Sequence, residues 1–188
     1  MSGTTEAEVR EAFPAVERIA DDDLRAGVIG TWTTALSDTG WTLAEAPWFP
    51  PVQDPLGLPD ERLVDHVNDV VACAEALADC LTERRDAGLS RDLLLAAALV
   101  HDVSKLYEFD ERGETRVHEL FGHPYYGIYP AGRAGLPPEV VHVVLSHTSR
   151  TGAEPATLEA ELVRRADEAA AAAIRAGAEG VDDLRDAP

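Results

Sequence analysis

The chain has 188 residues and a formal net charge of −19, and 45% of its residues are hydrophobic, which is typical of a globular protein with a sizeable core. The negative charge disfavours nucleic acid and anionic membranes as partners, but a small anionic substrate can still bind where cations gather. With no signal peptide and no apolar run of about 18 residues, we expect a cytoplasmic protein.

The first 58 residues are predicted to form helices over 5–20 and 22–39 and a loop over 46–61. Apolar spacing indicates the two helices. The loop follows from its five prolines, because proline is excluded from helix interiors. We expect this region to pack onto the body of the protein. Three tryptophans should serve that packing rather than bind a ligand: Trp32, Trp41 and Trp48.

The body is predicted to span 59–177, with a flexible tail over 178–188, in a single globular unit. Apolar spacing and capping signals place its helices at 59–87, 91–103, 136–147 and 157–176. Tyr107 and Phe109 lead into a polar turn ending at Gly113, which indicates a short hairpin. The expected fold is therefore all-α with one small hairpin.

Each of these four helices carries an ionisable residue on its apolar stripe. The residues are His66, His101, His147 and Asp167, and Asp102 follows His101 directly. The first stripe reads Leu63, His66, Val70, Cys73, Leu77 and Cys80. Burying several unpaired polar groups is costly, so these side chains must meet one another or a cation. Histidine and carboxylate together suit a divalent metal. Taken singly, a buried histidine is more often a hydrogen-bonded core residue, and Asp167 could pair with a nearby arginine.

The order His66, His101-Asp102, Asp167 resembles the H…HD…D signature of the HD-domain superfamily of metal-dependent phosphohydrolases. The resemblance covers about residues 60–176 and implies an HD-type helical bundle. It also implies that these four residues share one metal.

Two further histidines resemble a six-ligand, binuclear subset of that superfamily: His123 in "GHPYYG" and His147 in "LSHTSR". In that subset His123 and His147 would bind a second metal, with Asp102 shared. The resemblance thus implies two divalent transition metals, iron or manganese first, with cobalt, nickel or zinc as alternatives. "HDVSK" also resembles the HDxxK form of the HD-GYP phosphodiesterases. Thr148 stands where those proteins have a second histidine and the GYP tripeptide is absent, so cyclic-di-GMP is not expected as the substrate.

The resemblance implies hydrolysis of a small phosphoester, such as a nucleotide or related metabolite, through a metal-bound hydroxide. Asp102 and Lys105 are the candidate catalytic residues, because Lys105 lies one turn after His101 and can neutralise phosphoryl charge. Arg150 and Tyr125 are further candidates for binding the substrate. A solvated surface position is the alternative for both Lys105 and Arg150.

Two other functions fit the same ligands. The six-ligand arrangement followed by a lysine also resembles myo-inositol oxygenase and the HD-domain oxygenase that cleaves aminophosphonates, which use two irons and dioxygen. A non-catalytic, metal-stabilised module is the third interpretation.

His142 lies about 140° around its helix from His147 and is expected at the surface, whereas His118 could line the pocket. The oligomeric state and the substrate are not determined by the sequence.

Overall fold

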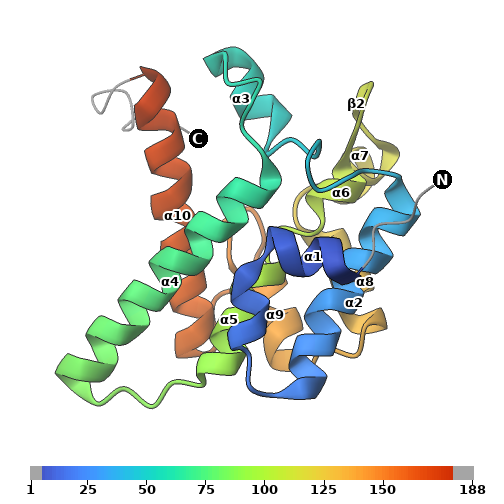
Figure 1. The fold of residues 1–188 in the computed structure, drawn as a ribbon. Helices are drawn as coiled ribbons and strands as arrows, with labels where there is room; N and C mark the ends of the chain where they lie inside the picture. The colour runs from blue at the N-terminus through green and yellow to red at the C-terminus, as the bar shows by residue number, and fades with distance from the viewer. Residues whose placement is uncertain (1–5, 180–188) are drawn as a thin grey trace.

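The computed structural model describes residues 6–179, and helices dominate it (Figure 1). Its helices are α1 (Glu6–Ala12), the 3-10 helix η1 (Pro14–Arg18), α2 (Asp22–Thr39), α3 (Pro50–Leu56), α4 (Leu63–Arg85), α5 (Arg91–Val100), α6 (Lys105–Glu108), α7 (Arg116–Phe121), the 3-10 helix η2 (Tyr125–Gly127), α8 (Ile128–Arg133), α9 (Pro138–Ser146) and α10 (Leu158–Glu179). The antiparallel strands β1 (Phe109–Asp110) and β2 (Gly113–Glu114) form one small hairpin. The prediction of an all-α bundle with a hairpin after the HD pair is confirmed.

Helix α5 is the central element of the bundle. Every residue from Leu94 to Val100 is buried, because α2, α4, α9 and α10 pack around it. A helix enclosed on all sides needs no polar face, which explains its uninterrupted apolar run. Helices α4 and α10 pack along each other beside it (Figure 1). The carboxyl end of α5 therefore carries His101 and Asp102 into the interior, where both are buried.

The N-terminal elements α1, η1 and α2 pack around one another, and η1 and α2 also pack against α5. The indole N–H of Trp32 donates to the carbonyl of Leu99 at 2.9 Å, so this tryptophan serves the packing that was predicted. The single helix predicted over 5–20 is wrong. The chain breaks before Pro14, because proline has no N–H to continue the α-helical hydrogen bonds.

The loop predicted over 46–61 is also wrong, because it contains α3. Two of its prolines occupy the first turn, where the backbone N–H groups have no partner within a helix in any case. The Gln53 carboxamide oxygen accepts the N–H of Phe49 at 2.8 Å and so caps the helix start. Pro55 lies near the end of this two-turn helix, so it removes only one late hydrogen bond.

The apolar stripe predicted on α4 holds only for its first half. Leu63, His66 and Val70 are buried, but Leu77 is 37% exposed and Cys80 is exposed. Small residues form the buried face further along the helix instead, where α10 packs closely: Ala74 and Ala78. From Val70 the buried face advances by four residues at a time, to Ala74 and Ala78, whereas the predicted stripe alternated steps of three and four and so moved away from that face.

Helix α10 continues through residues 178 and 179, the first two of the predicted tail, and 180–188 lie outside the described residues. Within the described part, no helix is both long and apolar enough to cross a membrane.

Candidate metal centre

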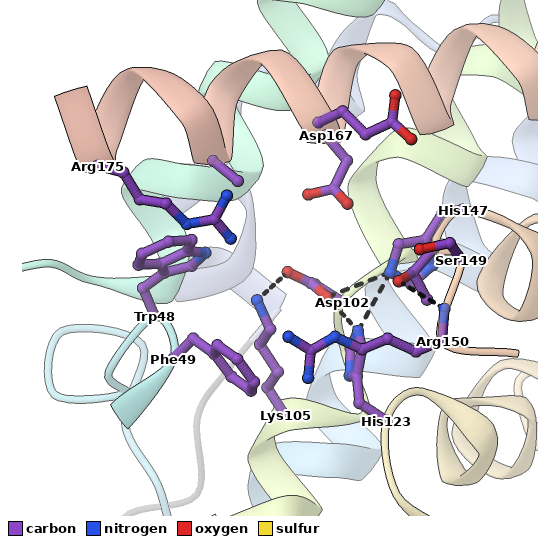
Figure 2. Close-up of a pocket in the computed structure, with 13 residues that line it drawn as sticks. Trp48, Phe49, Asp102, Lys105, His123, His147, Ser149, Arg150, Asp167 and Arg175 are labelled. Atoms are coloured by element: carbon purple, nitrogen blue, oxygen red, sulfur yellow. Dashed lines mark hydrogen bonds and ion pairs between the residues drawn. The ribbon is translucent and has the colours of Figure 1, made fainter. Parts of the chain in front are cut away.

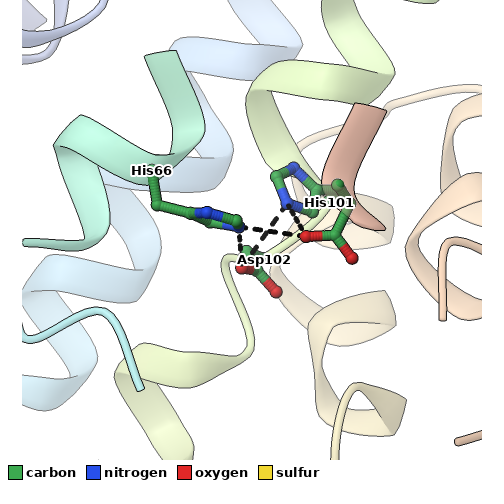
Figure 3. A group of neighbouring side chains, drawn as sticks. His66, His101 and Asp102 are labelled. Carbon is green, nitrogen blue, oxygen red and sulfur yellow. Dashed lines mark ion pairs between the residues drawn. The ribbon is translucent and has the colours of Figure 1, made fainter. Parts of the chain in front are cut away.

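Six side chains from distant parts of the chain converge at the inner end of α5. Four of their ligand atoms, those of His66, His101, Asp102 and Asp167, lie within 4.8 Å of one another. Figure 3 shows His66, His101 and Asp102 directed toward one another. A second group shares Asp102 and adds His123, from the segment between α7 and η2, and His147, at the end of α9. The structure thus brings together all six residues that the sequence proposed as metal ligands.

The two oxygens of Asp102 face different groups. Its Oδ2 lies 3.2 Å from the Nε2 of His66 and 3.4 Å from the Nε2 of His101. Its Oδ1 lies 3.2 Å from the Nε2 of His123 and 3.5 Å from that of His147 (Figure 2). One oxygen toward each group is the arrangement that a carboxylate needs to bridge two ions.

The second group depends on a close approach of η2 to the body. A Cβ at Gly127 would lie 2.7 Å from a methyl carbon of Val144 and 3.2 Å from the Cβ of Ser104. Only glycine leaves room for this contact between η2, α9 and the turn before α6. The segment that carries His123 can therefore lie against the end of α9, where His147 is found.

Two of the imidazole rings are held by backbone carbonyls. The Nδ1 of His101 lies 2.7 Å from the carbonyl of Ala98, and the Nδ1 of His147 lies 2.9 Å from that of Val144. A carbonyl can only accept, so Nδ1 carries the proton in both rings and donates it. The Nε2 lone pair of each ring is then directed into the site, as in histidines that bind metals.

Glu108 orients the third ring, and sequence reasoning missed it. This fully buried carboxylate lies 3.0 Å from the Nδ1 of His123. Burial opposes protonation of His123, but Glu108 and Asp102 outweigh it and raise the pKa of His123 to about 9. Burial likewise raises the pKa of Glu108, and His123 reverses this and lowers it. The sequence signal that could have identified Glu108 is its position three residues after Lys105. His118 lies 3.7 Å behind Glu108 and does not line the pocket.

Both carboxylates of the site are held in their ionised form. Burial raises the pKa of Asp102, but Lys105 and His101 outweigh it and hold that pKa well below the usual range. Burial acts in the same direction on Asp167, and His66 is the main group that holds its pKa low instead. Ionised carboxylates beside imidazole lone pairs are what a divalent metal ion requires.

Unpaired buried nitrogens support the same conclusion. Within the described part of the chain, the Nε2 atoms of His66 and His101 have no hydrogen-bond partner, although carboxylate oxygens lie within 3.4 Å of each. Such orphaned groups are rare in folded proteins and need an explanation. The Nε2 atoms of His123 and His147 face each other at 3.2 Å in the second group. The donor set therefore fits two divalent ions.

A cavity of about 210 Å³ opens onto Asp102 from the solvent side (Figure 2). The Nζ of Lys105 lies 2.5 Å from the Oδ2 of Asp102 and 5.4 and 5.2 Å from the ring centres of Trp48 and Phe49. Trp48 thus lines the pocket, which corrects the prediction that it serves packing alone. Sequence reasoning also missed Phe49, and neither residue carries a spacing signal, because both precede the helices of the site.

The remaining candidates divide. Arg150 lines the cavity, and its guanidinium carbon lies 4.9 Å from the ring centre of Phe49. Tyr125 does not line the cavity and is 40% exposed, so the structure does not bring it to the site. His142 lies away from the site, as expected, but it is half-buried rather than at the surface, because its Nε2 accepts the backbone N–H of Ala156 at 3.0 Å.

Comparisons with known proteins agree with this arrangement. A family model described as "HD domain" matches residues 63–172, more than half of the chain. The chain is also 29% identical over 168 residues to the dihydroneopterin 2',3'-cyclic phosphate phosphodiesterase of Methanocaldococcus jannaschii. That match covers 81% of this chain and 65% of the relative, so the chain spans less than two thirds of the relative's length. No solved structure matches this chain.

Proposed function

Because the chain belongs to the HD-domain family, we infer that it is a metal-dependent phosphohydrolase that acts on a small phosphoester. The observation that carries this inference is the position of Asp102, with one oxygen toward each of two ligand groups beside a cavity that also holds a buried lysine. The name of the phosphodiesterase relative supports the same class of reaction.

The side chains of the site have distinct roles in this proposal. When bound, two metal ions lower the pKa of a water molecule toward neutrality and neutralise phosphoryl charge. Asp102 holds the two ligand groups at a fixed separation. The Nζ of Lys105 lies beside Asp102 in the cavity and would donate to a phosphoryl oxygen of the substrate. Trp48 and Phe49 cover the lysine and exclude water from it, which strengthens that contact.

The size of the cavity limits the substrate. About 210 Å³ is below the usual range of pockets that enclose a whole drug-sized ligand, so the cavity suits a phosphoryl group and a small adjoining part. The relative's printed substrate is a 2',3'-cyclic phosphate, and we propose small cyclic phosphodiesters as the first compounds to test. Phosphomonoesters of nucleosides and sugars follow as the second group.

The test is a substrate panel assayed with manganese-, cobalt- and iron-loaded protein, with and without oxygen, after elemental analysis of each form. We expect close to two metals per chain and ester hydrolysis that needs metal and does not need oxygen. Oxygen consumption by the iron form on a polyol or phosphonate, with no ester hydrolysis, would establish the diiron oxygenase instead. Metal binding without any turnover would favour the metal-stabilised module.

A further inference from the structure

Among residues 6–179, two arginines at the mouth of the cavity have no acidic partner. Arg150 follows α9 and Arg175 lies in the last turns of α10, and both line the cavity. Among the side chains that the structure describes, no carboxylate pairs with either of them. Arg164 and Arg165, on the same helix as Arg175, both pair with glutamates. Acidic residues outnumber Lys and Arg by 35 to 16 in this chain, so two arginines beside one cavity without a described carboxylate partner give this cavity a local positive charge.

The fold positions both guanidinium groups. Arg150 lies over the ring of Phe49 at 4.9 Å, a cation–π contact that holds the side chain without neutralising its charge. Arg175 follows Asp167 by eight residues on α10, which places it on the same face and about 12 Å further along the helix. Ala171 lies between them and leaves the space open. Figure 2 shows both guanidinium groups directed into the space in front of Asp102.

A third unpaired donor lies in the same wall. Trp48 is only 2% exposed, and its buried indole Nε1 has no hydrogen-bond partner among the described residues. Its ring lies beside Arg175 at the cavity (Figure 2). A buried N–H without an acceptor is costly, so an acceptor atom from a ligand would remove that cost.

The charge of the inner site does not need these arginines. Two divalent ions and Lys105 would exceed the charge of Asp102, Asp167 and Glu108 by two, which balances the roughly two negative charges of a phosphate monoester. Glu168 also lines the cavity, but Arg165 binds its carboxylate at 2.7 Å. The two arginines therefore leave positive charge for a further anion.

We propose that Arg150 and Arg175, with the N–H of Trp48, form a subsite for a second phosphate group of the substrate. The subsite rests on the proposed function, because it assigns the substrate class of the same cavity: small phosphoesters that carry a further phosphate. Trp48 and Arg175 both lie outside residues 63–172, the part that matches the family model. The subsite thus combines one residue from the matched part, Arg150, with two from outside it.

The test is calorimetric titration of the manganese-loaded protein with orthophosphate, pyrophosphate and tripolyphosphate, with metal content measured before and after. We expect at least one of the two longer anions to bind tenfold or more tightly than orthophosphate. Arg150→Gln and Arg175→Gln should each remove most of that preference, since a charge-assisted hydrogen bond is typically worth about tenfold or more, and should leave orthophosphate binding within about twofold.

The matched control is Arg84→Gln. It removes the same charge from an exposed position near the end of α4, about 27 Å along the helix from His66, well beyond the screening length of about 8 Å at physiological salt. It should change neither affinity. No preference for longer anions in the unaltered protein, or equal weakening of all three anions in the arginine variants, would overturn the subsite. No turnover is needed, so the subsite and the proposed hydrolysis can fail separately.

Discussion

Replacing Lys105 with methionine should destabilise the metal-free protein far more than the metal-loaded protein. In the metal-free protein Lys105 is the nearest cation to Asp102, and the side chains are only 7% and 1% exposed. Removing one partner of a buried ion pair typically costs about 3–5 kcal/mol, because the other charge stays buried without compensation. Four imidazoles near Asp102 also partly compensate its charge, so we expect a cost at the lower end of this range, about 3 kcal/mol. Bound metals would take the place of the lysine as counterions of Asp102, so the cost in the metal-loaded protein should be much smaller.

The sign of the pH dependence follows from the same pair. The pKa of Asp102 is lowered in the folded protein, so its carboxylate contributes stability above the unfolded pKa of about 3.9 that is lost as the pH falls through the folded value. Without Lys105 that pKa rises. Acid unfolding of the metal-free Lys105→Met protein should therefore begin at a higher pH than in the unaltered protein.

The assay is urea unfolding of both proteins in chelator and with manganese, followed by a turnover measurement. Turnover of the loaded variant should fall on the order of a hundredfold, about 3 kcal/mol in the barrier, with metal content unchanged. Equal destabilisation with and without metal would refute the idea that metals and Lys105 neutralise the same carboxylate. Unchanged turnover would refute a contact between the lysine and the reacting phosphoryl group.

Three further predictions concern the metals and the surface. By elemental analysis, Asp102→Ala should lose most of both metals, and it should lose all activity, whereas His123→Ala should lose one metal. His142→Ala should keep both metals, because the His142 ring accepts a backbone N–H of a loop and lies away from the ligands. Since the pKa of His123 is about 9 without metal, calorimetry should show that the affinity for the second metal rises about tenfold per pH unit from pH 7 toward 9. The stability that this raised pKa gives the metal-free protein is fully present below about pH 6.5 and is lost as the pH rises through 9. His123→Gln should abolish both trends. With a net charge of −19, the melting temperature should rise with sodium chloride over the first few hundred millimolar as surface repulsion is screened, and a flat response would contradict that repulsion.

Local patterns determined much of this molecule. The spacing of apolar residues indicates the buried face of a helix, so the positions of α4, α5, α9 and α10 follow from the sequence. An ionisable residue on such a face can then be recognised as an exception. The errors came where backbone chemistry competes with periodicity. Pro14 divides a helix that the apolar spacing joined, and α3 forms over prolines that seemed to exclude it.

The tertiary structure alone decided how the site is completed. Glu108 meets His123, and Trp48 and Phe49 cover Lys105, because packing brings segments together whose sequence spacing carries no shared period. The sequence predicts which residues are buried, because burial follows from the type and spacing of individual residues. It does not record which of them touch across elements, since those contacts depend on distances between helices set by the whole core. Five of the six proposed ligands were visible in the sequence because each lies on or next to an apolar helix stripe. His123 was proposed only from the resemblance to the HD superfamily, and the groups that orient the ligands and shape the cavity were not found.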